Sequence, residues 1–565
     1  MKISTGKVVL LLLIVLFQGR LVRSEKVPYD YSANIECVKE PEKPLYGGGI
    51  ISGAEAPAAA AATSAGGKKL LMEKGTGGTG SGHCPVPVKG SALKVDLKKD
   101  HHYALSVWLQ LSEGTGDISA LLVTPDGKFN TAGIIVAQSG CWTLLKGGAT
   151  SLAEGKGDLF FESNSTGKIM AESLALQGFS FDDWEAHRDE VIAKERKKVV
   201  KITVEVGGKP VPNAELSMEW VAKGFPLGNA MTKEILDKPE YEEWFTKRFK
   251  WATMENEMKW YGTELSKGKE DYTLPDKMLE LAEKHNISVR GHNVFWDDET
   301  HQMDWVNKLS LPELKEAVAK RLKSVVTRYA GKLIHWDVVN ENLHFKFFEE
   351  KLGKDASGEI FAEVAKLDDK PILFMNEFNT IEQSCDKASV PTKYIAKLKE
   401  IQSFKGNENL KYGIGLESHF DTPNIPYMRG SLDTLAAAKV PMWLTEVDVS
   451  KGPKQVEYLE EVMREGFGHP GVKGIVLWGA WHANGCYVMC LTDNNFKNLP
   501  QGDVVDKLLK EWREVPGDAK TDDKGVFEGE LFHGEYSVKV KHDSLKEPIV
   551  QTVDLDTKSE ATISC

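Results

Sequence analysis

The feature that most constrains the fold is a series of short, apolar, β-rich runs in the second half of the sequence. Stretches of helical character separate them, and the stretch 311–329 carries Leu314, Val318 and Leu322 on one helical face. Alternating strands and helices of this kind build a parallel sheet. Eight such runs over roughly 290 residues predict a (β/α)8 barrel of class α/β. The runs are 226–231, 251–257, 287–296, 333–341, 371–378, 412–420, 440–449 and 472–481.

Nearly every run ends in polar or aromatic side chains. Because the carboxyl ends of barrel strands converge on one face, these side chains are expected to meet there. A requirement for stability alone would not gather polar groups at one end of successive strands. The residues are Glu255, Asn256 and Lys259; His292 and Trp296; Asn340 and Glu341; Asn376 and Glu377; Glu417 and His419; Glu446 and Asp448; Trp478 and Trp481.

Two of these runs end on a glutamate in a similar setting, Glu341 after Trp-Asp-Val-Val-Asn and Glu446 after Trp-Leu-Thr. Cleavage of a glycosidic bond needs such a pair, one acid to protonate the leaving oxygen and one carboxylate on the other side of the anomeric carbon. A single Asn-Glu after a strand is more often a cap or a salt-bridge partner. The sequence contains no H-E-x-x-H or comparable ligand spacing, so we expect neither a metal nor a cofactor.

Six blocks in order along the barrel region carry a family resemblance: Thr253-x-Glu255-Asn256-x-x-Lys259, Arg290-Gly291-His292-x-x-x-Trp296, and residues 335–341, 415–420, 445–448 and 477–479. Together they resemble glycoside hydrolase family 10, the retaining endo-1,4-β-xylanases. The tracts 342–345 and 485–493 resemble the plant members. The chain departs at Glu417, where many members carry Gln, and at Asp297, where many carry His. An added acid near the two glutamates disfavours ionisation of its neighbours, which would move the pH optimum.

The resemblance implies a role for each matching residue. Glu341 resembles the general acid/base, Glu446 the nucleophile, and His419 the residue that orients the nucleophile. The acid must keep its proton near working pH, whereas the nucleophile must stay ionised. Asn340 is expected to bond the sugar 2-hydroxyl, and Trp478 to stack on a sugar ring. The other expected substrate-binding residues are Glu255, Asn256, Lys259, His292, Trp296, Glu417 and Trp481.

The region before the barrel has two parts. Residues 1–24 are typical of a secretory signal peptide, with Lys2 and Lys7 before an apolar run and small residues at the end. Residues 25–180 are β-rich, and the tracts 46–50 and 140–148 resemble the family 22 carbohydrate-binding module, a β-sandwich. The stretch 54–82 is rich in Ala, Gly, Thr and Ser, which predicts a disordered loop. The module therefore either binds sugar or only stabilises the chain.

Two short β segments bracket the barrel. A charged linker helix is expected at 181–199, followed by strands within 200–222, and further strands follow within 517–565. Neither segment offers enough strands to bury a core alone. We expect them to form one small prealbumin-like β-sandwich, with the barrel, residues 223–515, inserted between its halves. The alternative is that each segment packs separately on the barrel.

Net charge, glycosylation sequons and cysteine content bear on the binding partners and the location of the protein. The formal net charge of −12 argues against nucleic acid and anionic membranes, which need a basic face. We expect a secreted monomer, extracellular or in the cell wall, that acts on xylan or arabinoxylan. The sequons at Asn164 and Asn286 fit export. Seven cysteines allow up to three disulfides, and Cys486–Cys490 is the favoured pair because the two are close in sequence.

Three other functions stay open at this point. The same glutamates would serve a xylan transglycosylase or a related retaining β-glycanase. A non-catalytic wall-binding protein is the alternative from a different class. That protein would have lost a catalytic carboxylate, and both glutamates are present here.

Overall fold

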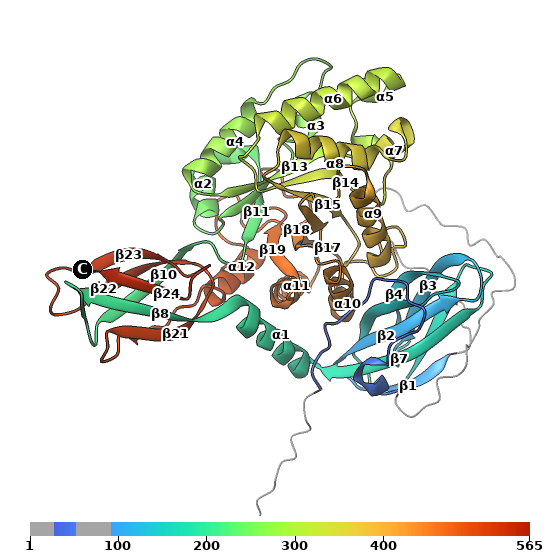
Figure 1. Cartoon of the computed structure of the whole chain (residues 1–565), viewed down its shortest axis with the longest axis horizontal. Coiled ribbons are helices and arrows are strands. Elements are labelled where there is room, and N and C mark those ends of the chain that lie inside the picture. The colour runs from blue at the N-terminus through green and yellow to red at the C-terminus, as the bar shows by residue number, and fades with distance from the viewer. Residues whose placement is uncertain (1–26, 52–91, 565) are drawn as a thin grey trace, which may run out of the picture.

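A ring of parallel strands lies at the centre of the chain (Figure 1). The structure is a computed structural model that describes residues 27–51 and 92–564. The signal peptide expected at 1–24 and the loop expected at 54–82 lie outside these residues. None of the helices in the described ranges is long and apolar enough to cross a membrane.

The predicted eight-stranded barrel is confirmed. Each strand pairs in parallel with its neighbours, and a pairing between β16 and β18 closes the ring. The short strand β17 (His419–Phe420) pairs with β18 outside the ring. The ring strands are β11 (Leu227–Met231), β12 (Trp251–Met254), β13 (Ser288–Trp296), β14 (His335–Asn340), β15 (Ile372–Glu377), β16 (Tyr412–Leu416), β18 (Met442–Val449) and β19 (Val472–Leu477).

Helices surround the ring and bury their apolar faces against it. The predicted amphipathic helix is α6 (Leu311–Arg328), which begins with a capping box between Ser310 and Glu313 and buries the expected face. The other helices are α2 (Pro239–Thr246), α3 (Trp260–Thr263), α4 (Thr273–Lys284), α5 (Asp304–Asn307), α7 (Phe347–Leu352), α8 (Ala356–Leu367), α9 (Pro391–Ser403), α10 (Ile425–Ala436), α11 (Gln455–Gly468) and α12 (Pro500–Glu511). Short 3-10 turns lie at η1 (Leu45–Gly48), η2 (Lys233–Leu236) and η3 (Glu299–His301).

The N-terminal unit, residues 27–51 and 92–180, contains two antiparallel sheets that share one apolar core. One sheet has the order β1 (Leu93–Leu97), β6 (Gly155–Ser163), β3 (Thr115–Val123), β4 (Phe129–Gln138). The other has the order β5 (Thr143–Ser151), β2 (His101–Leu111), β7 (Ile169–Ser180). A disulfide between Cys37 and Cys141 ties the segment 27–51 to these sheets.

Helix α1 (Phe181–Arg196) connects the N-terminal unit to a small unit formed by residues 197–222 and 519–564 (Figure 1). The helix is shorter than the expected 181–199, because Lys197 already begins strand β8 (Lys197–Val206) and Val200 is buried in the small unit's core. One sheet pairs β8 with β9 (Lys209–Pro210), β21 (Val526–Phe532) and β24 (Glu560–Ser564). The other has the order β20 (Ala519–Lys520), β10 (Glu215–Ala222), β22 (Glu535–Lys541), β23 (Ile549–Asp554). Residues from both ends of the barrel segment thus fill one core.

The N-terminal unit docks on the barrel through a buried charge on α10. Asp433 accepts hydrogen bonds from Tyr29 Oη at 2.8 Å, and its carboxylate lies 2.6 Å from Lys146 Nζ. His469 Nε2 lies 3.0 Å from the same carboxylate. Burial would raise the pKa of Asp433, but Lys146 and His469 lower it. The backbones of the two units also approach closely beside Lys146. A Cβ on Gly430 of α10 would lie 2.6 Å from the backbone nitrogen of Gly147, so this contact requires glycine at position 430.

Replacing Asp433 with Asn should loosen this docking. The change leaves the Lys146 ammonium buried without a counter-charge, which typically costs about 3–5 kcal/mol. We expect a lower thermal transition and faster proteolysis of the N-terminal unit. Because the pKa of Asp433 is depressed in the folded protein, its contribution is present above the unfolded-state pKa and is lost as pH falls through the folded-state pKa. The difference between variant and parent should therefore shrink at acid pH.

The matched control is Asp117→Asn, which breaks a second ion pair across the same junction. Asp117 lies 3.2 Å from Lys393, but that pair is partly exposed. Such pairs contribute roughly 0–1 kcal/mol. Equal losses of stability in the two variants would contradict the assignment of Asp433 as the docking charge.

Candidate functional site

A cleft of about 560 Å³ opens at the carboxyl ends of the barrel strands. The structure brings together all but one of the residues that the sequence assigned to a site. Those that line the cleft are Glu255, Asn256, Lys259, His292, Trp296, Asn340, Glu341, Glu417, His419, Glu446 and Trp478.

Trp481 does not lie among the residues that line the cleft. Its side chain is buried, and its Nε1 donates a hydrogen bond to Asn494 Oδ1 at 2.9 Å. Its ring packs against Tyr241 and Phe496. The structure therefore gives Trp481 a place in the packing of the loop after β19.

Glu341 sits at the turn that follows β14. Its backbone has a positive φ of 62° and donates a hydrogen bond to Asn376 O at 2.9 Å, which fixes the turn. Its carboxylate accepts a hydrogen bond from Asn340 Nδ2 at 3.0 Å. Burial, then the nearby charges of Glu417 and Glu377, raise the pKa of Glu341 well above its ordinary value. This carboxyl group therefore keeps its proton to higher pH than an ordinary glutamate does.

The pKa of Glu446, in β18, is shifted in the opposite direction from that of Glu341. Asn376 Nδ2 donates to its Oε1 at 3.0 Å, and His419 Nε2 lies 3.5 Å from its Oε2. Burial alone would raise the pKa of Glu446, but His292 and His419 lower it below the ordinary value. The pKa values of two buried glutamates on one cleft are thus driven in opposite directions.

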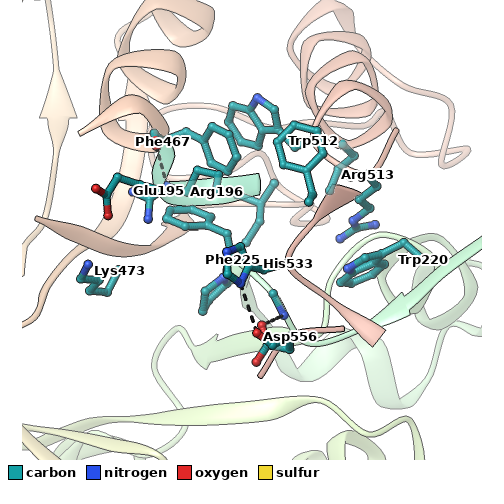
Figure 2. Close-up of a pocket in the computed structure, with 15 residues that line it drawn as sticks. Glu195, Arg196, Trp220, Phe225, Phe467, Lys473, Trp512, Arg513, His533 and Asp556 are labelled. Atoms are coloured by element: carbon teal, nitrogen blue, oxygen red, sulfur yellow. Dashed lines mark hydrogen bonds between the residues drawn. The ribbon is translucent and has the colours of Figure 1, made fainter. Parts of the chain in front are cut away.

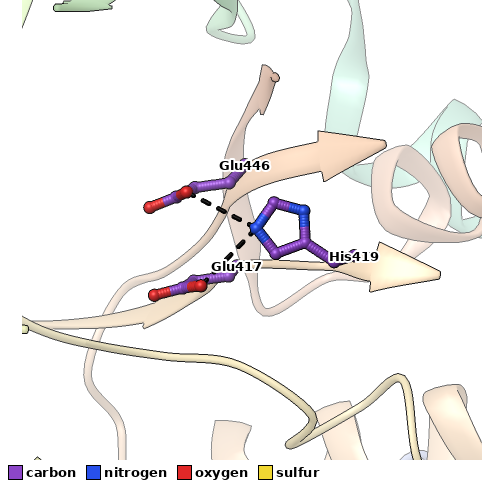
Figure 3. Close-up of side chains that lie close together, drawn as sticks. All are labelled: Glu417, His419 and Glu446. Atoms are coloured by element: carbon purple, nitrogen blue, oxygen red, sulfur yellow. Dashed lines mark ion pairs between the residues drawn. The ribbon is translucent and has the colours of Figure 1, made fainter. Parts of the chain in front are cut away.

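Glu417 is a third buried carboxyl group in the cleft. It lies near Glu446, with His419 between the two (Figure 3). Its Oε1 accepts a hydrogen bond from Asn376 Nδ2 at 3.2 Å, and its Oε2 lies 3.5 Å from His419 Nε2. Burial, then the charge of Glu446, raise the pKa of Glu417 to about 8. At neutral pH the group is therefore mostly protonated and lets the site hold a third carboxyl group without a third charge.

His419 lies between the two carboxyl groups and a buried aspartate. Its Nδ1 lies 2.9 Å from Asp448 Oδ1, and its Nε2 faces Glu417 and Glu446. Burial alone would lower the pKa of His419, but Asp448, Glu417 and Glu446 raise it well above its ordinary value. The neighbouring carboxyl groups therefore favour the charged form of the imidazole.

The orientation of His292 is fixed by a buried aspartate of the neighbouring strand β14. Its Nδ1 lies 2.9 Å from Asp337 Oδ2, and Asp337 forms a fully buried ion pair with Arg290 at 2.6 Å. Burial would raise the pKa of Asp337, but Arg290 and His292 lower it. His292 Nε2 is left facing Glu446 at 3.9 Å.

Hydrogen bonds and aromatic contacts fix the position of Asn256 and its neighbours at one end of the cleft. Lys259 Nζ donates to Asn256 Oδ1 at 3.3 Å and lies 4.5 Å from the centre of the Trp296 ring. Tyr261 Oη donates to the same oxygen of Asn256 at 2.7 Å. The Trp296 ring also stacks on His301, with ring centres 3.8 Å apart. A planar aromatic ring and several hydrogen-bonding groups thus share one end of the cleft.

Sequence reasoning did not assign a role to several cleft residues. Tyr487 is 56% exposed, lines the cleft and is held in a loop closed by the predicted Cys486–Cys490 disulfide, which the structure confirms. Phe345 and Phe378 line another part of the cleft. The tract 485–493 was a visible signal for Tyr487, whereas nothing local in the sequence shows which way a loop aromatic points.

Asp297, the second position where the chain departs from its resemblance, is not among the residues that line the cleft. Its Oδ1 accepts a hydrogen bond from the backbone of Phe348 at 2.9 Å. Burial raises the pKa of Asp297 to about 7. The carboxyl group of Asp297 therefore belongs to the packing between the end of β13 and the start of α7.

A separate cavity of about 200 Å³ lies where the barrel meets the small unit (Figure 2). Trp220, Phe225, Phe467 and Trp512 contribute aromatic walls. Arg196 donates hydrogen bonds to the backbone oxygens of three barrel residues, Phe467, His469 and Val472. None of the residues assigned to a site from the sequence lines this cavity.

Comparisons with known proteins agree with the barrel region. The sequence model of glycosyl hydrolase family 10 matches residues 216–495. Endo-1,4-beta-xylanase 4 of Arabidopsis thaliana is 38% identical over 557 residues, 95% of this chain and 94% of the relative. Endo-1,4-beta-xylanase 5 of Arabidopsis thaliana is 42% identical over 472 residues, 81% of this chain and 82% of the relative. The crystal structure of xylanase 10B from Thermotoga petrophila RKU-1 in complex with xylobiose is 22% identical, with a TM-score of 0.44 over 51% of this chain and 94% of that chain.

Proposed function

Because the chain belongs to glycosyl hydrolase family 10, we propose that it is a retaining endo-1,4-β-xylanase that hydrolyses xylan or arabinoxylan. The observation that carries this proposal is the pair of buried glutamates, Glu341 and Glu446, whose pKa values are driven in opposite directions on one cleft. Two carboxyl groups with separated pKa values are what an acid and a nucleophile require. No cofactor enters the reaction that we propose.

In the proposed mechanism, Glu446 attacks the anomeric carbon while Glu341 gives its proton to the leaving glycosidic oxygen. The bond to the leaving sugar breaks, and a covalent glycosyl ester forms on Glu446. Glu341, now ionised, then takes a proton from a water molecule that attacks the anomeric carbon. The ester breaks, both glutamates return to their starting states, and the configuration at the anomeric carbon is retained.

The other cleft residues take supporting roles in this proposal. His419 orients the nucleophile, because its Nε2 faces Glu446 and its Nδ1 is fixed by Asp448. Asn340 bonds the sugar 2-hydroxyl, a contact that strengthens in the transition state. Trp478 gives a stacking surface, and the residues that bind the remaining hydroxyl groups are Glu255, Asn256, Lys259, His292, Trp296 and Glu417.

We assign the two outer units supporting roles. Residues 25–180 are proposed as a module similar to carbohydrate-binding family 22, and residues 200–222 with 517–565 as a small prealbumin-like sandwich around the catalytic segment 223–515. The tract 146–148 of the module contacts α10 of the barrel, which supports a stabilising role for that part of its surface. Asn164 and Asn286 are exposed, which suits glycosylation of a secreted, monomeric wall enzyme.

Replacing each glutamate with glutamine should separate their roles. Without its acid, Glu341→Gln should lose about 10²–10⁴-fold in the rate of xylan cleavage. It should still release the phenol from an activated aryl β-xyloside, since that leaving group needs little protonation. Glu446→Gln should lose both reactions. Steady-state assays on both substrates, with circular dichroism as the control for folding, make the comparison; near-wild-type rates in both variants would sink the assignment.

The pH profile should reveal Glu417. On the alkaline side of its pKa of about 8, Glu417 is ionised, and after burial its charge is the largest cause that raises the pKa of Glu341, so Glu417→Gln should lower the pKa of Glu341. A like charge on a neighbouring carboxyl group raises a carboxyl pKa by about 1 unit or more. Removing it should therefore move the alkaline limb of the kcat/KM profile to lower pH by about that amount. The control is Glu457→Gln, the same change on the exposed face of α11. Superimposable profiles for Glu417→Gln and the parent enzyme would show that Glu417 does not influence the acid.

A further inference from the structure

Three side chains at the floor of the cleft place their ligand atoms at the spacing of a metal site (Figure 3). One oxygen from each of Glu417 and Glu446 and one nitrogen of His419 all lie within 4.8 Å of one another. His419 Nε2 is 3.5 Å from the nearest oxygen of each glutamate. A tetrahedral Zn²⁺ with bonds of about 2.0–2.2 Å holds its ligand atoms roughly 3.3–3.6 Å apart. The two measured separations fall within that range.

Each of the three ligands is fixed by a neighbour on its far side. Asp448 Oδ1 lies 2.9 Å from His419 Nδ1, so the imidazole presents Nε2 to the cleft. Asn376 Nδ2 donates to Oε1 of both glutamates, at 3.0 Å for Glu446 and 3.2 Å for Glu417. The Oε2 atoms of both glutamates therefore face the same imidazole nitrogen. Such outer contacts orient and strengthen the ligands of protein metal sites.

Other histidines with nearby carboxylates lack this convergence. His344 has Glu377 at Nδ1 and Asp386 at Nε2, so the two carboxylates lie at opposite nitrogens of the ring. His285 faces one carboxylate, that of Glu242, at 2.6 Å. Within residues 27–51 and 92–564, the cluster at Glu417 is the one whose His, Asp or Glu ligand atoms converge.

We propose that Glu417, His419 and Glu446 form a binding site for a tetrahedral divalent transition-metal ion, with Zn²⁺ as its best-suited occupant. Binding of the ion would displace the proton of Glu417 and the proton on His419 Nε2, and the resulting two carboxylates and one neutral imidazole balance its charge. The cleft leaves the fourth coordination position to water. A nitrogen ligand and only three protein donors suit Zn²⁺, whereas Mg²⁺ and Ca²⁺ prefer six or more oxygen ligands.

Metal at this position occupies the carboxylate of Glu446. It would therefore act as a reversible inhibitor that competes with xylan, and this consequence rests on the proposed role of Glu446 as nucleophile. The binding site itself does not depend on that role, since it follows from the positions of the three ligands.

Calorimetric titration of the full chain with ZnCl₂ tests the site. We expect one saturable site and no comparable heat with MgCl₂. Glu417→Gln removes one ligand and should weaken Zn²⁺ binding at least about 10-fold, the smallest loss that follows even from removal of an outer contact. Glu242→Gln, the same change beside the surface histidine His285, is the matched control and should bind Zn²⁺ like the parent protein.

The outcomes separate the metal site from the proposed function. Equal Zn²⁺ affinity in Glu417→Gln and the parent would overturn the metal site, as would the absence of saturable binding. Binding that is lost in Glu417→Gln, together with Zn²⁺ inhibition of xylan cleavage that excess substrate relieves, would support both proposals. Binding that is lost in Glu417→Gln without inhibition of the parent would support the metal site and contradict Glu446 as the nucleophile.

Discussion

The side-chain amide of Asn376 is the contact around which the cleft is arranged. Its nitrogen donates toward Glu446, Glu417 and Asn340, and its oxygen accepts from Thr445 Oγ1 at 2.6 Å. The backbone oxygen of the same residue accepts from Glu341 at 2.9 Å. One buried residue of β15 thus ties β14 to the carboxyl ends of β16 and β18. A displacement of Asn376 would move both proposed catalytic glutamates, so their relative positions depend on the closure of the barrel.

The charges in the cleft follow from that packing. Three carboxyl groups lie close together out of water, and they cannot all ionise. The cations His419 and Lys259 and the imidazole of His292 lower the pKa of Glu446, while burial raises those of Glu341 and Glu417. Protonation therefore depends on the balance of neighbours: His292, His419 and Lys259 together favour the charged form of Glu446, whereas burial and the nearby carboxylates favour the neutral forms of Glu341 and Glu417.

Much of the barrel could be predicted from the sequence because its information is local. Apolar runs that end in polar residues mark strands whose carboxyl ends meet, and the periodic face of α6 is readable in the same way. The break between β16 and β17 could not be predicted from the sequence. It depends on Ser418, which adopts a φ of 72° and whose backbone nitrogen donates a hydrogen bond to the side chain of Glu382. The inward packing of Trp481 and the pairing of Lys146 with Asp433 also depend on partners far away in the sequence. The roles of the site residues stay predictions until the variants are measured.

The strands of the small unit come partly from before and partly from after the barrel segment, and this division limits the order in which the parts of the chain can fold. Strands β8 and β10 leave the ribosome before the barrel, but their partners β21 and β22 leave after it. At typical synthesis rates of 5–20 residues per second, the intervening segment of roughly 300 residues takes about 15–60 s. Buried positions such as Val200, Ile202 and Leu216 have no partner sheet during that time. The small unit is therefore the last to fold, and a nascent chain that stalls within the barrel presents an unpaired apolar strand to chaperones.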